Sequence, residues 1–179
     1  TVETTNNAGS IESEVFFHHG STSSIIFNKD ITISSNHISC DGYYFGQSGG
    51  TGTLASTKTI TILGNNPANF IGGDLRFYNF TYLGTTPHNF ELSSSAKYAY
   101  NSNTTWGCNT SFIAPRIYNK NTTFSGTASF EKTGKDNDDS YGGNTFMQNT
   151  IFSNSGSSHL LTGNNAPDDF RADLTLNNT

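Results

Sequence analysis

The chain has 179 residues, a net charge of −5 and nine Lys or Arg residues, and Ser, Thr, Asn and Gly supply 87 of its residues. So few cations leave no basic stripe for a phosphate backbone, and no apolar run approaches the roughly 20 residues that span a bilayer, so neither nucleic acid nor a membrane span is expected. A compact globule of this size needs a larger apolar share than 32%, whereas stacked coils each bury only a few side chains, so the composition favours one elongated all-β module over residues 1–179.

Strands are expected where apolar and polar residues alternate, because alternate residues of a strand point to the same face. The longest alternation is 57–63, with Thr and Lys outward and Ile and Leu inward. No stretch of ten residues has the apolar spacing of a helix, so no helix is expected. In chain order, the predicted strand segments are 15–17, 25–33, 37–45, 57–63, 77–83, 92–100, 112–118 and 127–132.

A Phe followed four and six residues later by small or apolar side chains recurs five times, once with an extra residue. Since positions i, i+4 and i+6 of an extended chain share one side, each unit is interpreted as an inward Phe, a turn and a short strand. The five units are Phe27-Ile31-Ile33, Phe70-Leu75-Phe77, Phe124-Ala128-Phe130, Phe146-Thr150-Phe152 and Phe170-Leu174-Leu176.

With weaker anchors in the gaps, eight inward anchors follow one another at a mean spacing of roughly 20 residues, in the range of stacked solenoid repeats. A second match, in which 64–79 returns as 163–178, also indicates repetition. These patterns predict a right-handed parallel β-helix (a β-solenoid) of about eight coils, roughly 40 Å long at ~4.8 Å per coil. The structural anchors are Phe27, Leu54, Phe70, Phe90, Trp106, Phe124, Phe146 and Phe170.

Several phrases of the chain resemble the long tandem repeats of very large secreted surface proteins of Bacteroidota. They are Gly143-Asn144-Thr145-Phe146, Leu160-Leu161-Thr162-Gly163-Asn164, Pro167-Asp168-Asp169-Phe170, Asp173-Leu174-Thr175-Leu176-Asn177-Asn178-Thr179, Ala55-Ser56-Thr57-Lys58-Thr59-Ile60 and Phe112-Ile113-Ala114-Pro115-Arg116. The resemblance covers most of the chain from about residue 50 and carries no catalytic motif. It implies an extracellular, cell-surface role in an adhesin-like filament.

Both ends lack a polar cap, so the chain is interpreted as one unit of a longer array. The expected function is that of a non-catalytic structural repeat in a surface fibre or adhesin stalk. Its expected partners are identical or similar modules, stacked end to end. The alternative is a β-helix module that binds a glycan or a cell surface, and the third hypothesis is a polysaccharide lyase or hydrolase.

The candidate metal ligands are Asp136, Asp138 and Asp139, in the irregular charged segment 132–143. Calcium favours such oxygen clusters, but the spacing lacks the turn glycine and distal Glu of an EF-hand. The preferred interpretation is a solvated acidic loop, and no cofactor is expected. A bound calcium ion is the alternative.

Catalytic residues are not expected. A polysaccharide-cleaving enzyme needs two or three acids clustered on one face, or an Arg–Lys pair with calcium. Here Asp74 and Asp173 are interpreted as turn residues, Glu91 and Glu131 are isolated, and the histidines lack neighbouring partners in the sequence.

The candidate binding residues are Tyr43, Tyr44, Tyr78, Tyr82 and Tyr141, in which aromatic rings could offer a stripe for sugars or proteins, while inward packing of half of the tyrosines is an equal alternative. In that alternative, the loop 132–143 would hold the ligand together with these tyrosines.

Three other patterns have structural interpretations. Asparagines at matching coil positions, such as Asn69, Asn89, Asn144 and Asn164, could stack into side-chain ladders. The outward Thr57, Thr59 and Thr61 resemble ice-binding rows but are explained by β-propensity, and the Asn-x-Ser/Thr sequons at Asn79, Asn103, Asn109, Asn121 and Asn177 are no more frequent than chance. Cys40 and Cys108 are expected to be free thiols, since about three coils would separate them.

Overall fold

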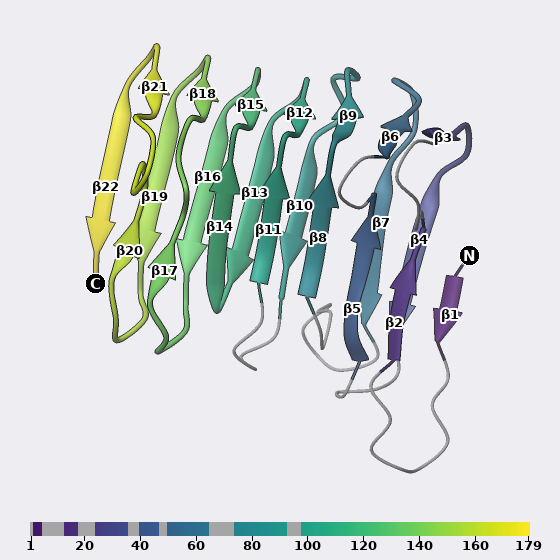
Figure 1. Ribbon diagram of the computed structural model, residues 1–179, viewed down its shortest axis with the longest axis horizontal. Coiled ribbons are helices and arrows are strands. Elements are labelled where there is room, and N and C mark those ends of the chain that lie inside the picture. Colours follow the sequence, from purple (N-terminus) through teal and green to yellow (C-terminus); the bar gives the residue numbers. More distant parts are fainter. Residues whose placement is uncertain are drawn as a thin grey trace.

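The computed structural model describes residues 2–4, 13–17, 24–35, 40–46, 50–64, 74–92 and 98–179. In these ranges every regular element is a β-strand, and all strand pairs are parallel. Figure 1 shows the strands side by side in a row, with the N-terminus at one end and the C-terminus at the other. Phe70, Asn69, His18, His19 and His37 lie outside the described residues.

The strands lie on three faces, which the chain visits in turn, so neighbours in a sheet are three elements apart in the sequence. This arrangement is consistent with the predicted β-solenoid. The first face, here called the long face, consists of β1 (Val2–Thr4), β4 (Ile31–Ser35), β7 (Ile60–Gly64), β10 (His88–Glu91), β13 (Thr110–Ala114), β16 (Ala128–Lys132), β19 (Thr150–Asn154) and β22 (Leu174–Asn178).

The second face, here called the tyrosine face, consists of β2 (Ser13–Phe16), β5 (Cys40–Phe45), β8 (Asp74–Tyr78), β11 (Tyr98–Ser102) and β14 (Arg116–Lys120), and the pair β17 (Asp138–Asp139) and β20 (Leu160–Leu161) continues it beyond β14. The third, the threonine face, consists of β3 (Ser24–Phe27), β6 (Thr51–Leu54), β9 (Phe80–Tyr82), β12 (Thr105–Trp106), β15 (Thr123–Phe124), β18 (Thr145–Phe146) and β21 (Asp169–Phe170).

Successive coils differ in length. On the long face Thr110 lies opposite Ala128, which lies opposite Thr150, so these coils contain 18 and 22 residues. On the threonine face Gly52 lies opposite Phe80, 28 residues later. The mean of roughly 20 residues inferred from the sequence therefore describes the C-terminal half better than the N-terminal half.

Six of the eight predicted anchors lie in register in one inward column on the threonine face. They are Phe27, Leu54, Trp106, Phe124, Phe146 and Phe170. Tyr82 fills the place between Leu54 and Trp106, so Phe90 is not part of this column, although the mean spacing of the anchors suggested that it was. Phe90 lies on the long face, where it begins a second inward column.

The two columns meet inside the coils and form the core together with inward side chains of the tyrosine face, such as Phe45 and Phe77. Phe112, Phe130 and Phe152 follow Phe90 in register on the long face, and their rings stack with centroids 5.8 and 4.9 Å apart. Phe124 packs edge-on against Phe130 at 5.2 Å, across the turn between β15 and β16. This is the predicted unit of an inward Phe, a turn and a short strand, and each coil buries its rings against those of its neighbours.

The sequence match between 64–79 and 163–178 does not place equivalent residues at equivalent positions. Leu75 belongs to β8 on the tyrosine face, whereas its counterpart Leu174 belongs to β22 on the long face. The two segments share an alternation of apolar and polar residues, which is compatible with either face.

The corner between the tyrosine and threonine faces contains an asparagine ladder. Asn79, Asn103 and Asn121 have φ angles of 46°, 52° and 47°, a left-handed conformation that Asn tolerates better than most residues. The side-chain amide of Asn121 donates to Oδ1 of Asn103 at 3.2 Å, and that of Asn103 donates to Oδ1 of Asn79 at 3.1 Å. Three of the five sequons therefore mark one recurring turn.

The outward threonines form one column on the threonine face. Its members are Thr53, Thr81, Thr105, Thr123 and Thr145. The triplet Thr57, Thr59 and Thr61 is not part of it, since Thr57 lies in a turn and Thr61 lies opposite Thr32 on the long face.

Candidate binding face

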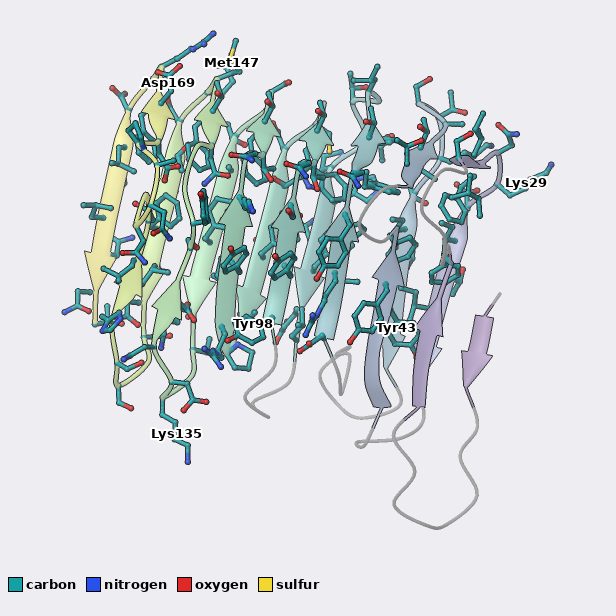
Figure 2. All side chains as sticks on the ribbon, viewed as in Figure 1. Lys29, Tyr43, Tyr98, Lys135, Met147 and Asp169 are labelled. Carbon is teal, nitrogen blue, oxygen red and sulfur yellow. The ribbon has the colours of Figure 1, made fainter. Side chains whose placement is uncertain are left out.

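The outer surface of the tyrosine face carries most of the aromatic side chains that do not enter the core. Tyr100 and Tyr118 are in register, and their rings stack 4.3 Å apart at an interplanar angle of 2°. Tyr78 packs against Tyr100 at 4.9 Å. Figure 2 labels Tyr98 near the start of β11, on the same sheet.

Arg76 lies between two tyrosine rings of this face. Its guanidinium carbon is 5.1 Å from the Tyr44 ring centroid and 5.7 Å from that of Tyr100. Its Nε donates to Oδ2 of Asp74 at 2.8 Å, and a second nitrogen donates to the Tyr78 hydroxyl at 3.3 Å. Burial opposes the charged form, but these hydrogen bonds raise the pKa of the Arg76 guanidinium above its usual value.

Arg116 and Lys120 extend the pattern along β14. The Arg116 guanidinium lies 4.0 Å from the Tyr98 ring centroid, and Lys120 Nζ lies 4.5 Å from that of Tyr141. Contacts between rings, and between cations and rings, thus occur from β5 to the segment after β17.

The predicted binding tyrosines divide between the inside and the outside of the coils. Tyr43 and Tyr82 are fully buried in the core, so they cannot meet a ligand. Tyr44 lies under Arg76 and is 7% exposed, while Tyr78 and Tyr141 are half-buried on the tyrosine face. Tyr98, Tyr100 and Tyr118 were not among the predicted binding residues, and their outward positions follow from the strand register.

The acidic segment is not the solvated loop that its charge suggested. Asp138 is fully buried and begins β17, where its Oδ2 accepts a hydrogen bond from the Ile117 amide at 2.9 Å. Its Oδ1 lies 3.9 Å from Arg116 Nε. Asp136 is half-buried, and the side chain of Asp139 lies outside the described part.

No group of three or more potential metal-binding side chains occurs among the residues that the structure describes. The remaining acids hold other polar groups. Asp168 accepts hydrogen bonds at 2.9 Å from both the backbone and the side-chain amide of Asn144, while burial raises its pKa. The side-chain oxygen of Asn144 in turn accepts a hydrogen bond from the Thr122 amide, so Thr122, Asn144 and Asp168 are linked across three successive coils.

His88 and Cys108 form the other polar contact near the core. His88 Nε2 accepts a hydrogen bond from the Ile60 amide at 3.1 Å, and Nδ1 lies 3.0 Å from the Thr86 carbonyl oxygen and 3.5 Å from Cys108 Sγ. These partners fit a neutral imidazole protonated at Nδ1. Burial lowers the pKa of His88 and raises that of the free Cys108 thiol to about 11, so the pair is not a thiolate–imidazolium nucleophile. Of Cys40, only the backbone is described.

On the tyrosine face, side chains of neighbouring strands contact one another through ring stacking and cation–π interactions. Because rings and guanidinium groups cover one another's faces, they present edges and hydroxyls to solvent, whereas a sugar-binding platform needs an exposed ring face. Comparison with known protein families, with curated proteins and with solved structures finds no match for this chain. The described residues contain no helix long and apolar enough to cross a membrane.

Proposed function

We propose that the chain is a right-handed β-solenoid of about eight coils that serves as a structural module of an extracellular surface fibre or adhesin stalk. The eight strands of the long face support the number of coils. Right-handedness is supported by the strong general preference of parallel strand connections. Ladders of rings, asparagines and threonines on successive coils give the rod stiffness without a catalytic site.

The observation that supports stacking is the apolar surface at the C-terminal end. Leu174 and Leu176 are 41% and 71% exposed, whereas Thr150 and Phe152, which lie opposite them on β19, are 1% and 4% exposed. Among the described residues, no strand pairs with the outer edge of β22. Such an edge favours pairing with another chain, and we propose that a similar module covers it.

Sedimentation velocity and electron microscopy of the wild-type protein over a concentration series test this proposal. We expect concentration-dependent end-to-end rods, which the double substitution Leu174→Lys and Leu176→Lys abolishes by placing charges in the stacking surface. The matched control, Thr175→Lys with Asn177→Lys, adds the same charge to the outward positions of the same strand and should still associate. A wild-type protein that is monomeric at every concentration would contradict the proposal.

Glycan binding by the tyrosine face is the second candidate, and what favours it is the row of outward tyrosines, whose edges and hydroxyl groups could hydrogen-bond a sugar without ring stacking. A glycan array with Tyr98→Ala and Tyr118→Ala variants separates the two functions. Uniformly flat binding supports the structural role, and a signal lost in both variants supports the binding role.

A further inference from the structure

The eight tyrosines of the chain differ in what lies against their rings. Two are fully buried in the core, and three have a cationic group no more than 5.1 Å from the ring centroid. The buried pair is Tyr43 and Tyr82, and the three rings beside a cation are those of Tyr44, Tyr98 and Tyr141. The other three, Tyr78, Tyr100 and Tyr118, form a row on the outer surface of the tyrosine face.

Tyr100 and Tyr118 are the most closely stacked pair of this row. They lie in register on β11 and β14, with ring centroids 4.3 Å apart and ring planes 2° from parallel. Because side chains in register on parallel strands extend in the same direction, each ring carbon of one lies above its counterpart in the other. The carbons ortho to the two hydroxyl groups, at which phenoxyl radicals couple, therefore face each other. The Tyr78 ring is farther from Tyr100, at 4.9 Å, and is tilted by 38°.

Both phenols of the pair are accessible to a small oxidant, since Tyr100 and Tyr118 are half-buried on the outer surface. Burial is the main cause that raises the pKa of Tyr100 above its usual value, and the neighbouring phenols of Tyr78 and Tyr118 add to this shift, the latter also through a hydrogen bond. Tyr100 is therefore a neutral phenol at physiological pH, and its oxidation removes an electron together with the hydroxyl proton.

The cations of the tyrosine face direct oxidation towards this pair. A positive charge over a ring face opposes the removal of an electron from that ring. The Arg116 guanidinium lies 4.0 Å from the Tyr98 ring centroid, whereas no cation lies over the Tyr118 ring among the residues that the structure describes. Arg76 is 5.7 Å from the Tyr100 ring centroid, near the limit of about 6 Å for such contacts. Tyr118 is therefore expected to be oxidised first, and Tyr100 is the ring nearest to it.

We propose that Tyr100 and Tyr118 form a site of oxidative cross-linking, at which a haem peroxidase with hydrogen peroxide joins the two rings as dityrosine. Each phenol loses one electron and its hydroxyl proton and becomes a phenoxyl radical. The two radicals form one carbon–carbon bond between ortho carbons, each of these carbons releases its proton, and each oxygen regains one, which restores both aromatic rings. The two tyrosines together lose two electrons and two protons, and hydrogen peroxide is reduced to two molecules of water.

The new bond links successive coils of the rod. Because β11 and β14 pair directly, the bond closes a covalent loop over residues 100–118. Such a loop restricts the unfolded chain, as a disulfide does, and thereby stabilises the stacked coils.

The test uses the full chain at low concentration. It is oxidised either by a haem peroxidase with limiting hydrogen peroxide or by photo-excited tris(bipyridine)ruthenium with persulfate, a small oxidant that reaches half-buried rings. Trypsin cleaves after Arg116, so Tyr100 and Tyr118 leave in different peptides. We expect mass spectrometry to find the peptides 98–116 and 117–120 joined, with a mass lower than their sum by two hydrogen atoms.

Three variants assign the bond to its residues. Tyr100→Phe and Tyr118→Phe keep the stacked rings but remove one phenol, and each should abolish the linked peptide. The matched control Tyr98→Phe removes a phenol from the same strand and the same tryptic peptide as Tyr100, and it should leave the yield unchanged. Unfolding in urea before oxidation should lower the yield several-fold, because the two rings are then no longer held together.

The proposal is wrong if neither oxidant produces the linked peptide, or if folded and urea-unfolded chains give equal yields. It is also wrong if the main cross-link joins another pair, such as Tyr78 and Tyr100. Loss of the product in Tyr98→Phe but not in Tyr100→Phe would assign the bond to Tyr98 and would equally refute the proposed site.

Discussion

At the scale of single residues, His88 couples stability to pH. Its imidazole is neutral in the folded protein because burial lowers its pKa, while the unfolded chain protonates near pH 6.5. Stability from this group is therefore complete above about pH 6.5 and declines as the pH falls through the lowered folded-state pKa. We expect the urea midpoint to drop between pH 7.5 and pH 5.

His88→Gln supplies an amide oxygen that can accept from Ile60 but does not titrate in this range. The variant should lose part of the pH dependence, whereas His159→Gln, at an exposed position, should keep it. Parallel pH profiles for wild type and His88→Gln would contradict the neutral, buried imidazole.

Asn103 provides a second residue-level test, because it has a positive φ and hydrogen bonds to the coils on both sides. Asn103→Gly keeps the left-handed turn but removes the side-chain bonds, and should cost about 1 kcal/mol of unfolding free energy. Asn103→Ala adds the backbone strain and should cost about 1 kcal/mol more. Urea denaturation of both variants measures the difference in unfolding free energy. Equal losses in the two variants would contradict a cost of the left-handed backbone conformation at this position.

The residues that sequence reasoning misplaced share a cause. Tyr43 and Tyr44 are adjacent in the sequence but lie on opposite sides of β5, and only the register decides which one enters the core. The sequons at Asn79, Asn103 and Asn121 matched chance frequency, so their stacking became visible only once the coil lengths of 24 and 18 residues aligned them.

At the scale of the elements, the unit of Phe, turn and strand accounts for the core. Phe130 on β16 contacts the rings of Phe112, Phe124, Phe146 and Phe152. Phe130→Ala should therefore lower the unfolding free energy by about 3–5 kcal/mol, because the coils above and below cannot close over the cavity. The control Ser129→Ala, at the outward neighbour, should change it by less than about 0.5 kcal/mol, and similar losses for both would contradict the packing.

Strand prediction located several strands, but the longest alternation, 57–63, overlaps β7 only from Ile60 onward, and prediction failed where charge dominated. The predicted segment 127–132 contains β16, and 112–118 contains parts of β13 and β14. The segment 132–143 reads as a loop because of its aspartates, yet Asp138 is buried in β17 where the Ile117 amide and Arg116 offset its charge. Both partners belong to the preceding coil, and Ile117 is 21 residues away in the sequence.

At the scale of the whole molecule, the recurrence of inward aromatics predicted parallel stacking. Neither the missing pairing between β7 and β10 nor the longer N-terminal coils could be predicted, because both depend on how many residues each coil contains. The mean spacing of the eight anchors concealed that Phe90 lies on another face than Phe27 and Leu54.

The central claim, that successive coils lie in register, can be tested by disulfide trapping on the threonine face. In a background with Cys40→Ser and Cys108→Ala, Thr105→Cys with Thr123→Cys, and Thr123→Cys with Thr145→Cys, place cysteines on adjacent strands. Neighbouring Cα atoms are ~4.8 Å apart there, within disulfide range. We expect both pairs to oxidise rapidly within one chain, while Thr105→Cys with Thr145→Cys, two strands apart at ~9.6 Å, does not. Cross-linking of the distant pair but not of the adjacent pairs would contradict the stacked coils.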